Sequence, residues 1–252
     1  MGDVWALADK YEAYVGRWSR PVAREFVGWL GAPAEGRWLD VGCGTGALAG
    51  TVRAALVVGV DRSLGFLSRA SAVRVNADAT ALPLRDGSFD AVVSGLALNF
   101  VPRPERAVAE LARVAAPGGV VAAYVWDYSG GMQMMRHFWD AAIAVDPFAA
   151  TADESPRFPI CHPPALAAAW TAAGLTRVET RGIEVPTVFA GFDDYWQPFL
   201  GGQGPAPSYL AGLPEAQRRA IRDRLAERLP RAADGTIPLT ATAWAVRGVR
   251  AI

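Results

Sequence analysis

The stretch Leu39-Asp40-Val41-Gly42-Cys43-Gly44-Thr45-Gly46 decides the fold of this 252-residue chain. Its first half continues the apolar run from Trp38 and predicts a strand, and its second half is a glycine turn that opens a helix expected over 47–55. Glycine permits positive φ and lets a ligand approach the backbone closely. Open α/β sheets bind ligands at the carboxyl ends of their strands, where this turn falls. The stretch therefore predicts an α/β fold and the place of its binding site.

Strands and helices alternate around this turn. Strands are expected over 38–41, 56–60, 73–76, 89–94 and 120–125, and helices over 20–30, 63–70 and 104–115. Such alternation favours right-handed crossovers and a mainly parallel sheet. Beyond residue 126 the rhythm breaks, and the expected elements are an aromatic-rich helical segment over 130–159, helices over 163–173 and 213–229, and strands over 177–184 and 236–246.

Composition limits the class of protein. The chain has 25 basic and 25 acidic residues, and this balance argues against a general nucleic-acid binder. Two cysteines and two histidines are too few for a disulfide framework or a zinc site, so no metal is expected. The first residues do not show the basic segment followed by an apolar segment that is typical of a signal peptide, and no run of about 18 apolar residues is seen. We therefore expect a cytoplasmic protein without a membrane span.

Carboxylates extend the site beyond the glycines. The pattern G-x-G-x-G, with Asp40 two positions before Gly42, differs from the G-x-G-x-x-G of nicotinamide and flavin enzymes. Asp61 ends the second strand, where a carboxylate can accept both hydroxyls of a ribose. Asp78 follows the third strand and has an oxygen that an exocyclic adenine amine can donate to. The alternative for each acid is a helix cap or a turn.

These motifs, in their order along the chain, resemble those of class I S-adenosylmethionine-dependent methyltransferases. The nearest subgroup includes the ubiquinone- and menaquinone-biosynthesis-type enzymes, and the resemblance covers residues 36–126. It is carried by Asp40-Val41-Gly42-Cys43-Gly44-Thr45-Gly46, Asp61, Asn76-Ala77-Asp78-Ala79, the run 82–90 and Pro117-Gly118-Gly119. The resemblance implies a Rossmann-like, seven-stranded, mostly parallel sheet with an antiparallel last strand, helices on both faces and a small, mainly helical cap.

The resemblance also implies a domain organisation. We expect one methyltransferase domain over 1–252, with the cap over the carboxyl ends of the strands. Its expected parts are N-terminal lid helices over 1–35, a cofactor-binding core over 36–126, cap insertions over 127–160 and 187–235, and the last helix and strands over 161–186 and 236–252.

The resemblance assigns the glycine turn and its two neighbouring acids to the cofactor, S-adenosylmethionine. Gly42, Gly44 and Gly46 would line its methionine and ribose portions. Asp61 would hold the ribose hydroxyls, and Asp40 would orient the methionine ammonium through the turn or a water.

Further cofactor residues follow from the same resemblance. Asp78 would read the adenine amine, with the Ala79 amide near the ring and Ser94 near the methionine moiety. In the lid, Arg17 would pair with the methionine carboxylate and Trp18 would face the sulfonium. A plain packing helix with a solvent-facing arginine is an equal alternative for the lid.

Residues for the methyl acceptor are less clearly marked. Asn99 follows the fourth strand, where enzymes that methylate nucleobase amino groups carry an Asn- or Asp-Pro-Pro-aromatic signature that this chain lacks. His137 is a weak candidate for a catalytic base. Tyr128, Trp139 and Trp196 are weak candidates for an apolar substrate pocket, with ordinary cap packing as the alternative.

The expected reaction is in-line displacement at the sulfonium methyl by an O, N or C nucleophile of an unidentified small molecule, with S-adenosylhomocysteine as product. Alignment alone can supply about 7–11 kcal/mol, and a base is needed only when the nucleophile must lose a proton early. One alternative is a nicotinamide-dependent oxidoreductase, which the form of the glycine turn and Pro117-Gly118-Gly119 disfavour. Others are a non-catalytic cofactor-binding relative and an enzyme that methylates RNA or protein.

Overall fold

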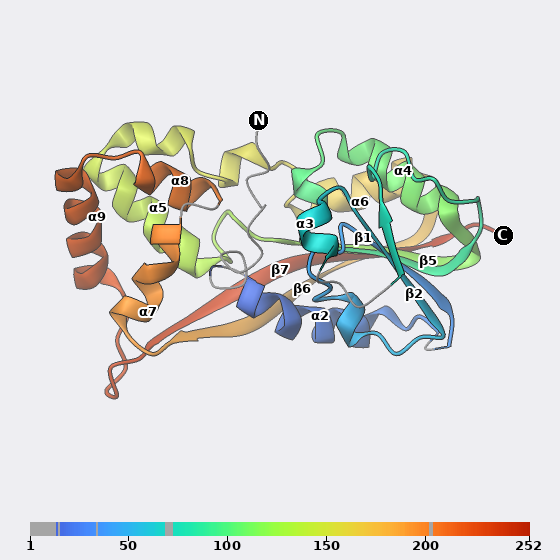
Figure 1. Ribbon diagram of the computed structural model, residues 1–252, viewed down its shortest axis with the longest axis horizontal. Coiled ribbons are helices and arrows are strands. Elements are labelled where there is room, and N and C mark those ends of the chain that lie inside the picture. The colour runs from blue at the N-terminus through green and yellow to red at the C-terminus, as the bar shows by residue number, and fades with distance from the viewer. Residues whose placement is uncertain (1–13, 15, 34, 69–72, 202–203) are drawn as a thin grey trace. The chain divides into compact units, whose positions relative to one another are not determined.

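The computed structural model describes residues 14, 16–33, 35–68, 73–201 and 204–252 (Figure 1). The chain divides into two compact units. The sheet unit consists of Ser19–Trp126, Pro159–Ile183 and Ala243–Ile252. The helical unit consists of Asp127–Phe158 and Glu184–Thr242, together with the described residues up to Trp18.

A seven-stranded sheet has the strand order β3-β2-β1-β4-β5-β7-β6. Strands β1 to β5 pair in parallel, and β7 pairs antiparallel with β5. This topology confirms the expected Rossmann-like, mostly parallel sheet with an antiparallel last strand. The strands are β1 (Arg37–Val41), β2 (Leu56–Asp61), β3 (Val73–Asn76), β4 (Phe89–Gly95), β5 (Ala115–Trp126), β6 (Leu175–Phe189) and β7 (Ile237–Arg250).

Helices cover both faces of the sheet, and Figure 1 shows α2 on the side opposite to α4 and α6. The Phe26 ring of α2 packs on Tyr124 of β5 with 4.5 Å between centroids. Trp170 of α6 donates from Nε1 to the Val121 carbonyl at 2.9 Å. Strands covered on both faces are continuously apolar, which explains the run of buried residues in β4. The helices of this layer are α2 (Arg17–Leu30), α3 (Leu64–Leu67), α4 (Pro104–Val114) and α6 (Pro163–Ala172).

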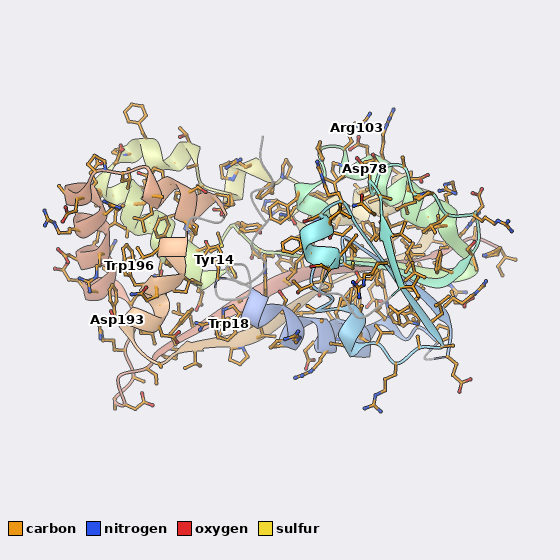
Figure 2. All side chains as sticks on the ribbon, in the orientation of Figure 1. Tyr14, Trp18, Asp78, Arg103, Asp193 and Trp196 are labelled. Atoms are coloured by element: carbon orange, nitrogen blue, oxygen red, sulfur yellow. The ribbon has the colours of Figure 1, made fainter. Side chains whose placement is uncertain are left out.

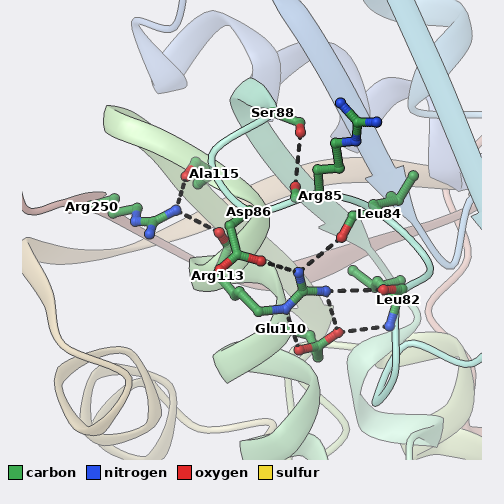
Figure 3. A network of polar contacts seen from close by, with 9 residues as sticks. All are labelled: Leu82, Leu84, Arg85, Asp86, Ser88, Glu110, Arg113, Ala115 and Arg250. Atoms are coloured by element: carbon green, nitrogen blue, oxygen red, sulfur yellow. Dashed lines mark hydrogen bonds and ion pairs between the residues drawn. The ribbon is translucent and has the colours of Figure 1, made fainter.

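The loop before β4 is tied to α4 through Arg113 (Figure 3). The Arg113 guanidinium donates to both oxygens of Glu110, at 2.7 and 2.8 Å, and to the Leu82 and Leu84 carbonyls, at 3.0 and 2.9 Å. It also pairs with Asp86. The loop 82–88, part of the run 82–90 that carries the resemblance, is therefore bound by an arginine of the neighbouring helix.

Two expectations about local structure are wrong. The helix expected over 47–55 is only the 3₁₀ turn η2 (Ala49–Thr51), because the chain there includes Gly50 and β-branched residues that favour extended backbone. The segment Pro117-Gly118-Gly119 lies inside β5, at a register shift, rather than before it. A Cβ at Gly119 would lie 2.8 Å from the Ala116 carbonyl oxygen, so this irregularity requires glycine.

The helical unit contains the segments that were expected to form the cap. Its core is aromatic: the Phe138 and Phe199 rings stack with 4.6 Å between centroids, and the Tyr195 hydroxyl donates to the Met134 carbonyl at 2.8 Å. Of the expected lid, residues 1–13, 15 and 34 lie outside the described residues. The helices of this unit are α5 (Gln133–Val145), η4 (Pro147–Thr151), η5 (Ser155–Arg157), α7 (Phe192–Trp196), η6 (Gln197–Gly201), α8 (Pro205–Ala211) and α9 (Glu215–Arg228).

None of the helices in the described ranges is long and apolar enough to cross a membrane.

Candidate functional site

The glycine turn follows β1, whose neighbours in the sheet are β2 on one side and β4 on the other. The order of a doubly wound sheet reverses at such a point and leaves a crevice for a ligand. Gly42, Gly44 and Gly46 have φ of +76°, +52° and +89°, a region that glycine enters without steric cost. The amides of Gly42 and Cys43 both donate to the Val60 carbonyl, at 2.7 and 3.0 Å, which fixes the turn against the end of β2.

Two glycines of the turn serve different purposes. A Cβ on Gly42 would overlap the Cβ of Ala97, so this glycine is required by packing inside the sheet unit. A Cβ on Gly44 would meet nothing within 4 Å. The backbone at Gly44 is therefore open to a ligand, as the sequence-based assignment requires.

Asp61 lies at the end of β2 and holds the same turn. Its Oδ2 accepts from the Gly44 amide at 2.9 Å, and its Oδ1 accepts from the Ser63 amide at 2.8 Å. Each carboxylate oxygen can accept two hydrogen bonds, so this structural role leaves acceptor capacity for two hydroxyls. Asp61 therefore acts as a turn residue in the structure, and its contact with the ribose hydroxyls remains a prediction.

Asp40 is a buried acid behind the turn, with an exposed fraction of 1%. Its Oδ2 accepts from the Ala49 amide at 3.2 Å, whereas its Oδ1 has no hydrogen-bond partner among the residues that the structure describes. Burial raises the pKa of Asp40 to about 7, and the charge of Asp61 adds to this rise. A buried carboxylate oxygen of this kind is suited to a cationic ligand.

Asp78 and Ala79 follow β3, at the same edge of the sheet as Asp61. The Asn76 side chain links the two strand ends, because its Nδ2 donates to the Asp61 carbonyl at 2.9 Å. Asp78 Oδ1 accepts from the amide and the hydroxyl of Thr80, at 2.8 and 2.7 Å, and these bonds lower the pKa of Asp78. Arg103, labelled with Asp78 in Figure 2, lowers this pKa further by its charge. Contact with adenine remains a prediction for both residues.

The end of β4 brings in a residue that the sequence did not mark. Leu96 has φ of +56°, a strained backbone for a γ-branched residue, and its amide donates to the Tyr124 carbonyl at 2.8 Å. Such strain gathers at functional sites. Ser94, two residues earlier in β4, is buried. In the following 3₁₀ helix η3 (Leu98–Phe100), Asn99 is 7% exposed, and neither polar atom of its amide has a partner within the described chain.

In the helical unit, Arg17 pairs with a residue that the sequence did not point to. Its Nη1 lies 2.9 Å from Oδ1 of Asp194, and its guanidinium lies 4.6 Å from the ring centroids of both Trp18 and Phe189. Its Nε and Nη2 are buried and have no partner in the described ranges. The assignment of Arg17 and Trp18 to the cofactor remains a prediction, and no local signal links Arg17 to an acid 177 residues away.

His137 is half-buried on α5. Burial lowers its pKa, the charge of Asp140 raises it, and that of Arg228 on α9 lowers it further. The side chain is therefore a neutral imidazole at pH 7 and able to accept a proton. Its role as a base remains a prediction.

The aromatic candidates for the acceptor pack within the helical unit. Trp196 is buried and stacks on Phe192 with 6.3 Å between centroids. The Tyr128 ring lies 5.5 Å from that of Phe158. Trp139 is buried, and its Nε1 donates to the carboxylate of Glu154. Packing therefore accounts for much of their surface, and contact with an acceptor remains a prediction.

In the part of the chain that the structure describes, no group of three or more His, Cys, Asp or Glu side chains is arranged to hold a metal ion.

Comparison with known sequences shows what the segment around the glycine turn is similar to. Residues 39–123 match the methyltransferase domain family Methyltransf_11. A demethylmenaquinone methyltransferase of Renibacterium salmoninarum is 42% identical over 110 residues, which cover 41% of this chain and 45% of that protein. An uncharacterised protein of Mycobacterium tuberculosis is 33% identical over 138 residues, half of each chain. This chain thus spans about half the length of the curated relatives that it matches.

Solved structures with the same fold include methyltransferases. A SAM-dependent methyltransferase from Thermotoga maritima has a TM-score of 0.60 at 19% identity, with 99% of this chain and 100% of that chain covered. The phosphoethanolamine N-methyltransferase 2 of Haemonchus contortus, solved with S-adenosyl-L-methionine, has a TM-score of 0.58 at 16% identity, with 95% of this chain and 56% of that chain covered. These identities establish the fold alone. Residues 39–123, which carry the ordered motifs, are similar to the methyltransferase domain family, and a demethylmenaquinone methyltransferase is among the proteins similar to this chain.

Proposed function

We propose that this protein is an S-adenosylmethionine-dependent methyltransferase that methylates a small molecule. The observation that carries this proposal is the turn after β1, where Gly44 leaves the backbone open and its amide donates to Oδ2 of Asp61. This turn lies within the segment that matches methyltransferase domains.

The residues around the turn fit the chemical groups of this cofactor. Asp61 can accept from the ribose hydroxyls, and the unpartnered Oδ1 of Asp40 can accept from the methionine ammonium, directly or through a water. Asp78 and the Ala79 amide would bind adenine, with Ser94 near the methionine moiety. When bound, the cofactor supplies a methyl group that its sulfonium already activates.

The chain's task in the reaction is then alignment and exclusion of water. Asn99 is suited to hold a polar group of the acceptor, because both polar atoms of its buried amide lack partners in the described ranges. We expect His137→Ala to lower the rate of methyl transfer without abolishing it, since alignment supplies most of the acceleration.

Thermal denaturation of the purified protein with S-adenosylhomocysteine, and separately with NADH, tests the cofactor assignment. A ligand that binds only the folded state raises the melting temperature as its concentration rises. We expect saturable stabilisation by S-adenosylhomocysteine and none by NADH. The reverse result would favour the oxidoreductase, and binding without turnover of any acceptor would favour a non-catalytic relative.

The variant Asp61→Ala tests the site directly. We expect it to bind S-adenosylhomocysteine about 100-fold more weakly than wild type, because two hydrogen bonds to a charged acceptor are lost. Isothermal titration calorimetry measures the affinity, and circular dichroism checks that the variant is folded. Asp61→Asn, which keeps one acceptor oxygen, should lie between the two. Wild-type affinity in folded Asp61→Ala would refute the assignment.

A further inference from the structure

A buried carboxylate in the helical unit has no role in the function proposed above. Glu154 is 1% exposed, and one of its oxygens, Oε2, accepts from Nε1 of Trp139. The other oxygen, Oε1, is buried and has no hydrogen-bond partner among the described residues. Buried polar atoms are nearly always paired, so this one calls for an explanation.

The charges around Glu154 do not neutralise it. Arg136 of α5 pairs with Asp153, the residue before Glu154, at 2.7 Å and with Asp140 at 2.8 Å. Arg157 attracts the Glu154 carboxylate and Asp153 repels it, but no ion pair to Glu154 forms within the described ranges. Burial is the main cause of a pKa raised to about 7. A carboxylate buried without a cation is costly, and a bound cation would remove that cost.

A second unpartnered oxygen lies within reach of the Glu154 charge. Tyr14 is 2% exposed, and its hydroxyl has no partner within the described chain. After burial, the charge of Glu154 is the largest cause that raises the pKa of Tyr14, and Tyr128 and Tyr195 add to it. A series of contacts also links the two residues: the Tyr14 ring lies 5.5 Å from Phe199, Phe199 stacks on Phe138 at 4.6 Å, Phe138 lies 5.1 Å from Trp139, and Trp139 donates to Glu154. Glu154 and Tyr14 therefore belong to one aromatic cluster of the helical unit.

Aromatic rings accompany these two oxygens. The Trp139 ring, whose N–H holds Glu154, lies 5.5 Å from the ring of Tyr209, and the Tyr209 hydroxyl also lacks a partner in the described part of the chain. The Tyr14 ring meets Phe199 edge-on at 5.5 Å. A carboxylate with one free oxygen, set among aromatic faces, matches the chemistry of an ammonium group.

Resting on the proposed methyltransferase function, we propose that the helical unit recognises an amine-bearing acceptor, with Glu154 as the counter-ion of its ammonium group. An ammonium carries three N–H donors. One would bind Oε1 of Glu154, and the Tyr14 hydroxyl is a second unpartnered acceptor among the described residues of the same unit. An acceptor with a carboxylate or phosphate in this place would be repelled by Glu154.

A binding experiment on the full chain, saturated with S-adenosylhomocysteine, tests this inference. The probes are phenethylamine and tryptamine, each compared by calorimetry with its neutral alcohol, 2-phenylethanol or indole-3-ethanol. We expect each amine to bind at least about tenfold more tightly than its alcohol, as one charged hydrogen bond implies. Glu154→Gln should abolish this preference, Tyr14→Phe should reduce it, and Glu184→Gln, which changes an exposed glutamate of the same unit, should keep it.

The outcomes separate this inference from the function on which it rests. Failure of wild type to bind S-adenosylhomocysteine would refute the proposed function. Normal binding of S-adenosylhomocysteine, with amines that bind no better than their alcohols or with an unchanged preference in Glu154→Gln, would refute the role of Glu154 alone.

Protein stability gives a second readout that needs no acceptor. A buried glutamate without a bound cation destabilises the folded protein while it is charged. Glutamine is neutral, so Glu154→Gln should raise the melting temperature at pH 8. The gain should vanish at pH 5, where the wild-type carboxyl is protonated. If Glu154 serves only to hold Trp139, the variant should instead melt lower than wild type at both pH values, which would overturn the inference.

Discussion

Asp78 and Asp234 form the same local structure in two different parts of the chain. In each, Oδ1 accepts from the amide and the hydroxyl of the threonine two positions later, Thr80 or Thr236. These bonds lower the pKa of both aspartates. Both aspartates therefore stabilise a turn. If substituting them has different effects on cofactor affinity, the difference must come from a contact with the ligand.

This pair yields a prediction at the scale of single residues. We expect Asp78→Ala to weaken S-adenosylhomocysteine binding about tenfold, because one hydrogen bond between the adenine amine and a charged oxygen is lost. Asp234→Ala breaks the matching turn and should leave the affinity unchanged. Titration calorimetry of both variants decides the matter: equal affinities would reduce Asp78 to a turn residue.

At the scale of elements, two glycines of the turn after β1 have different requirements: Gly42 is needed for packing, and Gly44 leaves the backbone open to a ligand. Gly42→Ala should cost about 3 kcal/mol or more, because it combines positive φ with an overlap against Ala97. Gly44→Ala should cost about 1 kcal/mol, since it meets only the backbone penalty, yet it should weaken cofactor binding by crowding the open backbone. Urea denaturation and calorimetry measure the two effects. Full cofactor affinity in Gly44→Ala would mean that the ligand does not approach this turn.

The attachment of the 82–88 loop to α4 gives a second prediction for an element. Arg113→Ala removes the side-chain bonds from Arg113 to the Leu82 and Leu84 carbonyls and leaves the partly buried Glu110 without its cation. We expect the free energy of unfolding to fall by about 2–4 kcal/mol in urea. Arg106→Ala, at an exposed position of the same helix, is the control and should stay within about 0.5 kcal/mol of wild type. A similar small effect for Arg113→Ala would show that the loop is held without it.

At the scale of the whole molecule, two buried acids make stability depend on pH. Burial raises the pKa of both Asp40 and Glu154 to about 7, from ordinary values of 3.8 and 4.5. The folded state therefore binds their protons more tightly than the unfolded state, and stability falls as the pH rises from about 4 to about 7. His137 opposes this trend, because its lowered pKa makes stability fall as the pH drops through 6.5.

We expect the two acids to prevail over the histidine. The free energy of unfolding in urea should be lower at pH 8 than at pH 5.5 by a few kcal/mol, since one unit of pKa corresponds to about 1.4 kcal/mol. The double variant Asp40→Asn/Glu154→Gln should flatten the profile. A wild-type protein that is more stable at pH 8 than at pH 5.5 would contradict the assignment of raised pKa values to these acids.

Much of the sheet and of the glycine turn was predictable from the sequence, because both leave local signals. Apolar runs mark buried strands, and the glycine pattern marks a turn with positive φ, so β1, β2 and β4 were expected nearly at their observed bounds. Asp61 was expected at a strand end, and it ends β2; its contact with a ribose stays a prediction. The helix expected over 47–55 was wrong, because periodicity alone does not weigh Gly50 and the β-branched residues beside it.

Tertiary structure alone decided which polar groups meet and which stay unpaired. Arg17 pairs with Asp194, and the cluster of Glu154 with Tyr14 spans 140 positions, so no local pattern marks either. The strain at Leu96 likewise depends on its neighbours in the folded chain. The sequence by itself determined the order of the elements and the glycine turn with its neighbouring acids. Both depend on hydrophobic periodicity and on the φ range of glycine, which act over a few residues. Burial and charge pairing act across the whole fold, and for that reason only the structure disclosed Glu154.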